Sequence, residues 1–239
     1  MATTNKDVTK ARWDSRAAKR FIDELTFRAM APWAMTGSKL KRVLSLPAAD
    51  WLWERNFTTT FPKNWVTFAG VEKSAPVWRK MKTTAKNLNT VKKSHQFVPC
   101  PRETDMADFL IKTPESYDMI YLDWMGTWSA AKELQLISIF ERRLLRKGGL
   151  LRMTMALDRG KKSIWSPFCE EDSAIMGFQD LRGVNTPLPE WKVYGIPRMI
   201  MNTAEELGVK LKLISAIAYM SREHPLKKGT PEASFLFRV

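Results

Sequence analysis

Short apolar runs alternate with helix-like segments along most of the chain. Runs too short for helices predict buried strands at residues 41–46, 65–71, 96–99, 117–123 and 150–155. Apolar residues at helical spacing predict helices at residues 48–57, 75–88 and 130–145, and a short helix through Phe109 and Leu110. The pair Gly148-Gly149 is expected to stop the helix before it. This alternation is typical of βαβ units, whose parallel strands are joined by right-handed crossovers.

The C-terminal part of the chain breaks this rhythm. Residues 158–192 are rich in turn residues and aromatics, which predicts an insertion above the sheet. A helix at residues 198–207 is expected to end at Gly208, and apolar runs at 209–220 and 234–239 predict an antiparallel hairpin. The predicted fold is α/β: a doubly wound, mostly parallel sheet in three layers, closed by a C-terminal antiparallel β-hairpin.

A leading segment, residues 1–38, precedes the predicted α/β domain at residues 39–239. Residues 10–35 show helical spacing, with apolar side chains on one face and basic side chains mostly around it. The apolar face suits packing on the sheet, and the basic face suits phosphate groups. Both interpretations can hold, because they use opposite faces.

The charge balance narrows the choice of partners. The 239 residues carry a formal net charge of +14, which favours a polyanionic partner. Nucleic acid, DNA or RNA, is the first candidate, an acidic membrane surface the second; an acidic protein partner or a larger complex also fits. No apolar run approaches the roughly 20 residues that span a bilayer, and the start MATTNKDVTK has no hydrophobic signal region. We therefore expect an intracellular, cytoplasmic protein.

Cysteine and histidine usage gives no indication of a metal site. Cys100 and Cys169 lie far apart without paired spacing, and only His95 and His224 are present. We expect neither a zinc site nor a disulfide framework.

The stretch YDMIYLDWMGTWS, residues 117–129, predicts a central strand that stops at a carboxylate and opens into a glycine-containing turn. Ligands of open α/β sheets bind beyond the carboxyl ends of the strands, so Asp123, Trp124 and Met125 are expected to face the crevice. A simpler interpretation, that Asp123 only caps the next helix, has equal standing on this evidence.

Two groups of basic residues are candidates for phosphate contacts. Between residues 73 and 93 there are seven basic residues and no acidic one, whereas ordinary surface helices mix both signs. The candidates in this first group are Lys73, Arg79, Lys80, Lys82 and Lys86. Those in the second are Arg142, Arg143, Arg146, Lys161 and Lys162. Of the ten tryptophans, most are expected in the core, with Trp124, Trp128 and Trp165 the better candidates for stacking on a base.

From about residue 41 to 239, the order of elements resembles the class I S-adenosylmethionine-dependent methyltransferase fold. RVLSLPAAD occupies the place of the first-strand loop, which in that family is Gly-rich and lies under the methionine part of the cofactor. FAGVE ends at the position of the acidic residue that holds the ribose, PRETD occupies the place of the adenine loop, and DWMG matches the motif beside the transferred methyl group. RKGGLLRMTM resembles the fifth strand with its glycine turn. The cofactor contacts that the resemblance implies are Leu46, Pro47, Ala48, Glu72, Glu103, Asp105 and Asp123.

Two functions follow from this resemblance. The first is a methyltransferase acting on DNA or RNA, in which Asp123 is an acceptor for a substrate amine or for the cofactor, and Trp124 stacks on the base. The second is a catalytically inactive, methyltransferase-like subunit that serves as a basic scaffold in a replication, transcription or viral complex. Pro47, Ala48 and Ala49 stand where the family has glycine, which favours the second; Glu72 and Asp123, each ending a strand, favour the first. Glu72 also has a plain interpretation as a helix cap.

Overall fold

The computed structural model describes residues 17–35, 41–62, 66–91, 94–124, 126–157, 179–180, 190–221 and 230–239. Lys161, Lys162, Trp165, Met125 and most of the predicted insertion at 158–192 lie outside these residues. No helix in the described residues is long and apolar enough to cross a bilayer.

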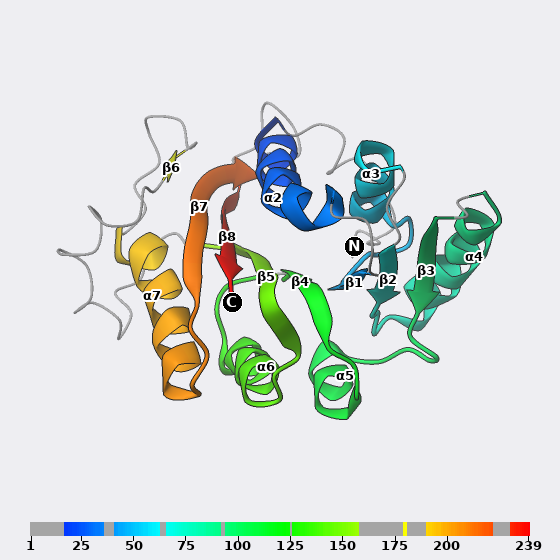
Figure 1. Ribbon diagram of the computed structural model, residues 1–239. Coiled ribbons are helices and arrows are strands. Elements are labelled where there is room, and N and C mark those ends of the chain that lie inside the picture. Colours follow the sequence, from blue (N-terminus) through cyan, green and yellow to red (C-terminus); the bar gives the residue numbers. More distant parts are fainter. Residues whose placement is uncertain are drawn as a thin grey trace, which may run out of the picture.

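A single sheet runs through the described part of the chain, with its strands ordered β3-β2-β1-β4-β5-β8-β7-β6 (Figure 1). The strands are β1 (Lys41–Ser45), β2 (Val66–Gly70), β3 (His95–Pro99), β4 (Tyr117–Asp123), β5 (Leu145–Ala156), β6 (Gln179–Asp180), β7 (Lys212–Ser221) and β8 (Thr230–Arg238). Strands β1 to β5 pair in parallel, whereas β8 is antiparallel to both β5 and β7. The predicted α/β sheet with a C-terminal hairpin is confirmed.

Helices cover both faces of this sheet. They are α2 (Ala17–Met35), α3 (Leu52–Thr60), α4 (Ala75–Val91), α5 (Met106–Lys112), α6 (Ala130–Glu141) and α7 (Glu190–Glu206). Side chains of α2, α3 and α4 form one buried cluster with Met119 and Tyr121, and side chains of α5, α6 and α7 form another with Ile120 and Leu122. Because successive residues of a strand point to opposite faces, β4 supplies both clusters, and the three predicted layers are present.

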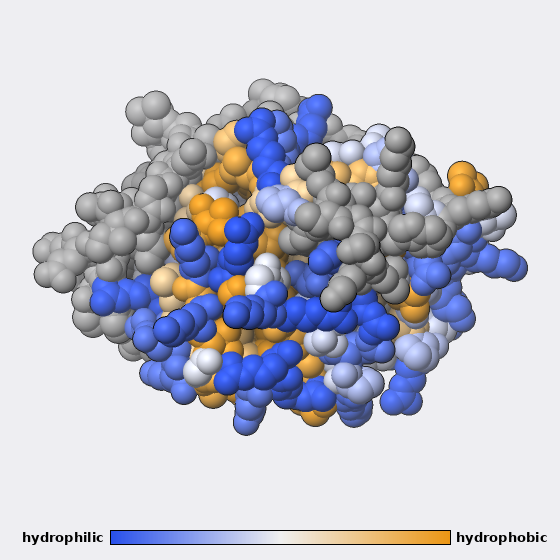
Figure 2. Space-filling view, in the orientation of Figure 1, coloured by the Kyte–Doolittle hydropathy of each residue, from blue (hydrophilic) through white to orange (hydrophobic). Residues whose placement is uncertain are grey.

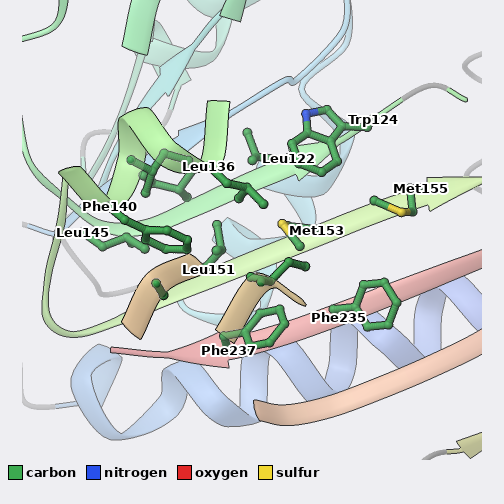
Figure 3. Close-up of a cluster of buried hydrophobic side chains, with 14 of the residues drawn as sticks. Leu122, Trp124, Leu136, Phe140, Leu145, Leu151, Met153, Met155, Phe235 and Phe237 are labelled. Carbon is green, nitrogen blue, oxygen red and sulfur yellow. The ribbon is translucent and has the colours of Figure 1, made fainter. Parts of the chain in front are cut away.

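The cluster under α5, α6 and α7 is the larger one and is almost entirely apolar (Figure 3). Leu151, Met153, Phe235 and Phe237 from β5 and β8 are fully buried in it. Burial of each such side chain contributes about 1.5–3 kcal/mol. This face therefore supplies much of the free energy that holds the central strands in place.

The predicted end of the helix at residues 130–145 is wrong. Helix α6 ends at Glu141, where Arg143 takes a left-handed φ of 53°. The N–H of Leu144 donates to Ile139 O at 3.0 Å and that of Arg143 to Phe140 O at 3.1 Å, which is a Schellman motif built without glycine.

Gly148 and Gly149 lie inside β5 instead of at the helix end. A Cβ on Gly149 would come within 2.7 Å of Arg146 O, so glycine permits this close backbone approach. Helix α7 begins at Glu190, well before the predicted residue 198, and keeps Pro197 inside at the loss of one helical hydrogen bond.

An asparagine of α4 protects one edge of the sheet. Strand β3 is terminal in the sheet order, and such edges expose backbone groups that can pair with other chains. Asn89 Nδ2 donates to Phe97 O at 2.9 Å, and Phe97 N donates to Asn89 Oδ1 at 2.8 Å. The side-chain amide thus pairs with the backbone as a neighbouring strand would.

We expect Asn89→Ala to lower the free energy of unfolding by about 1–3 kcal/mol, because it removes two hydrogen bonds from a partly buried peptide unit. Denaturant unfolding measures the change. Asn87→Ala, an exposed position on the same helix, is the matched control and should change stability little. Equal effects of the two substitutions would contradict the edge-protection role of Asn89.

Candidate functional site

The carboxyl ends of β1, β2 and β4 meet at one edge of the sheet and bring several of the predicted residues together. Val71 N donates to Ser45 O at 3.1 Å, and Thr104 N donates to Glu72 O at 2.9 Å. The first-strand loop, Glu72 and the segment with Glu103 and Asp105 are therefore neighbours. Asp123 lies at the same edge, because β4 pairs in parallel with β1.

The loop after β1 turns sharply although it has no glycine. Ala48 and Trp51 both have a φ of 52°, in the left-handed region that non-glycine residues seldom occupy. Such residues cost about 1–3 kcal/mol each and persist only where the surroundings hold them. The small residue needed here is Gly70 at the end of β2, where a Cβ would lie 2.4 Å from Trp51 Cη2 and 2.8 Å from Pro47 Cγ.

Two of the predicted cofactor residues accept hydrogen bonds from backbone N–H groups near the starts of helices, and Asp105 is a helix cap. Glu72 Oε1 accepts a 2.7 Å hydrogen bond from Ser74 N, just before α4, and its Oε2 makes no hydrogen bond with the described residues. Asp105 Oδ1 accepts a 2.9 Å bond from Ala107 N at the start of α5. One carboxylate oxygen of Glu72 thus bonds the backbone just before α4 and not an N–H of its first turn, so the capping interpretation stays a prediction, and the other oxygen is available to a ligand.

Asp123 is paired with a residue of the leading helix. Lys19 Nζ lies 3.6 Å from Asp123 Oδ2, and the two side chains are 11% and 32% exposed. An ammonium group beside a partly exposed carboxylate can hold that carboxylate in place while its second oxygen accepts a proton or a hydrogen bond from a ligand.

A second ion pair, deep under α2, lies close by. Arg152 Nη1 donates to Asp23 Oδ1 at 2.5 Å, and its guanidinium stacks 4.3 Å from the ring centre of Tyr121. Arg152 is 1% exposed and Asp23 is 4% exposed. Two residues of helix α2 therefore hold it to the sheet: Lys19 pairs with Asp123 of β4, and Asp23 pairs with Arg152 of β5.

Glu54, in the first turn of α3, is a buried carboxyl group at this edge of the sheet. Burial raises the pKa of Glu54 to about 7; the Ser45 hydroxyl and the residue's own N–H oppose the rise, while Asp23 and Asp123 add to it. The Ser45 hydroxyl lies close enough to act on the Glu54 carboxyl group but does not meet hydrogen-bond geometry, so Glu54 Oε2 and Ser45 Oγ have no hydrogen-bond partner in the described residues. Glu54 gives no signal in the sequence, because an acidic residue in the first turn of a helix is ordinarily favoured by the helix dipole.

The stacking role predicted for Trp124 is not supported by its placement. Its side chain is 6% exposed and belongs to the apolar cluster, and its Nε1 donates to Gln135 Oε1 at 2.9 Å (Figure 3). Trp128 meets it edge-on with ring centres 6.0 Å apart. Lys132 Nζ donates to the carbonyls of Gly126, at 2.8 Å, and Thr127, and burial lowers the pKa of Lys132 to about 8. These residues fix the turn that follows Asp123.

The two basic groups differ in their surroundings. The first group, Lys73, Arg79, Lys80, Lys82 and Lys86, is exposed along α4 and its N-terminal approach. Two of its members also contact the protein: Lys73 Nζ lies 4.0 Å from Asp105 Oδ2, and Lys82 Nζ lies 4.3 Å from the ring centre of Trp78. Hydrophilic side chains are seen at that end of the molecule, as they are across the lower part of the same view (Figure 2). We call these five residues the basic α4 face.

Arginines of the second group donate hydrogen bonds to other parts of the protein, away from the carboxyl ends of β1, β2 and β4. Arg142 Nη2 donates to Thr113 O at 2.8 Å, Arg143 Nη1 to Gly208 O at 3.0 Å, and Arg146 Nη1 to Asp118 Oδ2 at 2.9 Å. The structure does not bring this group to the candidate site, and it gives these arginines roles in holding α5, α6, α7 and β4 together. No group of three or more His, Cys, Asp and Glu residues in the described chain could hold a metal ion.

The strand order, with parallel strands β1 to β5 and the reversed β8 next to β5, is that of the class I, Rossmann-like methyltransferase fold. Asp123 ends β4, and Glu72 lies two residues beyond the end of β2. The sequence matches no family model and no curated protein significantly.

Solved structures share the fold at low sequence identity. An Escherichia coli protein, yhhF, described as a methyltransferase, is 11% identical over 93% of this chain and 86% of its own, with a TM-score of 0.50. A Galdieria sulphuraria protein described as a sarcosine dimethylglycine methyltransferase is 12% identical over 92% and 86%, with a TM-score of 0.50. The [4+2]-cyclase SpnF is 12% identical over 94% and 83%, with a TM-score of 0.51. Since one of the three is named for a cyclisation, the fold alone does not define the reaction.

Proposed function

We propose that this protein is an S-adenosylmethionine-dependent methyltransferase that acts on nucleic acid. The observation that carries the proposal is the Lys19–Asp123 pair at the carboxyl end of β4, beside the β1 loop and Glu72, in a methyltransferase fold. A lone capping role for Asp123 would not need a lysine from a helix more than a hundred residues away in the chain.

The residues at this edge fit the cofactor. Glu72 Oε2 makes no hydrogen bond with described residues and can accept one from a ribose hydroxyl, and the β1 loop makes left-handed turns without glycine. Leu46, Pro47 and Ala48 would line the methionine end, and Glu103 and Asp105 the adenine end. When bound, the cofactor supplies an electrophilic methyl group. Alignment of the nucleophile and exclusion of water by α2 are the contributions of the chain.

The choice of nucleic acid as substrate rests on the basic α4 face. Lys73 directly follows Glu72, so the row of exposed cations begins at the candidate site and runs along α4. A phosphate backbone lying on this row would lead a base or ribose toward Asp123. Asp123, paired with Lys19, would then orient a donor group of the nucleotide or take up its proton.

A second candidate function is the inactive scaffold. It is favoured by the loop after β1, where the side chains of Pro47 and Trp51 pack closely on Gly70. In the methyltransferase family this loop is rich in glycine, so that its backbone can contact the ligand. It predicts nucleic-acid binding without cofactor binding. Calorimetric titration of the protein with S-adenosylmethionine distinguishes the two functions, since saturable binding contradicts the scaffold and its absence contradicts the enzyme.

Glu72→Ala should weaken binding of S-adenosylmethionine by about 1–3 kcal/mol, the usual loss when donors are left without a charged acceptor. Calorimetry measures the change. Glu72→Gln separates ligand binding from the local backbone contact: the amide oxygen can still accept from Ser74 N, but the second acceptor is lost. Unchanged affinity in both variants would remove Glu72 from the site.

Asp123→Ala should reduce methyl transfer to DNA or RNA by about 100-fold or more, as expected when a proton acceptor is removed. Affinity for nucleic acid should not fall, because the change removes a negative charge. Transfer of labelled methyl groups and fluorescence anisotropy measure the two effects. Asp108→Ala, an exposed position on α5, serves as the control. Full transfer by the Asp123 variant would rule out the role.

The triple change of Lys80, Lys82 and Lys86 to Gln should make nucleic-acid affinity less dependent on salt. Log affinity falls by about 0.7–0.9 per phosphate contact for each tenfold rise in salt, so the slope should drop by about 2–3. The matched control changes Lys112, Lys147 and Lys210 to Gln; these are exposed lysines near the opposite edge of the sheet. Equal slopes for the two triple variants would show that α4 does not contact phosphate.

A further inference from the structure

Two side chains beside the β1 loop leave buried polar atoms without a partner. Ser45 ends β1 and is 0% exposed; Glu54, in the first turn of α3, is 1% exposed. Ser45 Oγ and Glu54 Oε2 have no hydrogen-bond partner among the described residues. A buried polar group left in this state costs about 1–3 kcal/mol, and more when it is charged. The fold thus tolerates a destabilising pair at the place where β1 meets its loop.

The cations of this region pair with other carboxylates. Lys19 lies against Asp123, and Arg152 bonds to Asp23. In the described chain no lysine, arginine or histidine forms an ion pair with Glu54, and the charged groups that act on it, Asp23 of α2 and Asp123 of β4, are both acidic. Both of these acids are themselves paired with cations, so the preference for a cationic ligand rests on the carboxylate of Glu54 itself.

We propose that Ser45 and Glu54 bind the ammonium group of a ligand, and that the amino-acid end of the cofactor supplies it. The proposal rests on the proposed function above. A primary ammonium has three donors, which suit a carboxylate oxygen and a hydroxyl that otherwise lack partners, and charge-assisted bonds of this kind are about twice as strong as neutral ones. The side chain of Glu54 then attracts the ammonium group. The backbone of the loop after β1 can approach a ligand less closely, because the loop has no glycine.

Because both atoms are covered by protein, a ligand reaches them only after a local opening. Helix α2 is the neighbouring element on that side: Asp23 acts on Glu54, and Phe27 packs against Trp53 and Phe57 of α3, with ring centres 5.6 and 5.7 Å apart. In Figure 1, α2 and α3 lie next to each other above the strand ends. Movement of α2 would open the way to Glu54 and to Asp123 together.

The test compares two ligands that differ at the amino-acid end. S-adenosylhomocysteine carries the ammonium group, and 5′-methylthioadenosine lacks the whole amino-acid part. Glu54→Gln should weaken binding of the first about 10- to 100-fold in calorimetry and change binding of the second less than about twofold. Ser45→Ala should show the same selectivity with a smaller loss. Glu24→Gln, on the exposed side of α2, is the control and should change neither.

The pH dependence gives an independent readout. Glu54 binds a proton up to about pH 7, and a cationic ligand favours the carboxylate form, so the affinity for S-adenosylhomocysteine should rise toward about pH 7 and level off above it. Glu54→Gln should remove this rise. Without ligand, the raised pKa of Glu54 means that the native state loses stability as pH rises from about 4.5 to about 7. The ligand-free Gln variant should therefore melt at the same or a higher temperature than the wild type above pH 7.

Three outcomes would overturn this proposal. If the wild type binds both ligands and Glu54→Gln weakens them equally, the residue has a structural role. If it weakens neither, Glu54 lies outside the site, and the proposed function still stands. If the wild type binds neither ligand, the proposed function fails, and the ammonium site fails with it.

Discussion

The buried ion pair between Asp23 and Arg152 is the contact on which the arrangement of the candidate site depends. Arg152 lies in the middle of the sheet, 1% exposed and stacked on Tyr121, so breaking the pair by removing one partner would cost about 3–5 kcal/mol. Residues four apart on a helix share a face, and Lys19, Asp23 and Phe27 follow this spacing along α2. The pair that anchors the middle of the helix therefore also sets Lys19 at Asp123 and Phe27 on α3.

The two faces of the sheet differ in the polar groups that they bury. The face under α5, α6 and α7 is apolar and closely packed, and it holds β4 and β5 in register. The face under α2 carries Tyr121, Arg152 and the hydrogen-bonded pair Thr154–Ser234 near the carboxyl ends. Buried polar groups stabilise less than apolar ones when their bonds are incomplete, as they are at Asp23, Tyr121 and Arg152. The incompletely bonded polar groups thus lie on the face under α2, next to the candidate site, although this face also buries an aromatic cluster that includes Trp53, Phe57 and Phe68.

The sequence predicted the sheet well because its central strands are buried on both sides and appear as uninterrupted apolar runs, such as MIYL in β4. It failed where local signals conflict with tertiary ones: Gly148-Gly149 resembles a helix stop, but Arg143 ends α6 because its backbone bonds back to Phe140. Asp123 was identified from its place after a strand. Its partner Lys19 was not, since the pairing depends on how α2 crosses the sheet. Glu54 gives no sequence signal at all, because its unusual state is a product of burial.

The absence of glycine after β1 is weaker evidence against cofactor binding than it looks from the sequence. Glycine serves such loops by allowing left-handed backbone and close approach. Here Ala48 and Trp51 adopt the left-handed conformation at a cost in strain. The glycine that allows close contact is Gly70 on the neighbouring strand, against which the side chains of Pro47 and Trp51 pack. Backbone strain of this kind persists only where surrounding contacts impose it, and Trp51 is held by a 3.1 Å bond from its Nε1 to Met81 O and by burial against Phe97. The loop therefore keeps a sharp turn by packing, and the turn places the first helical residues of α3, Glu54 among them, over the end of β1.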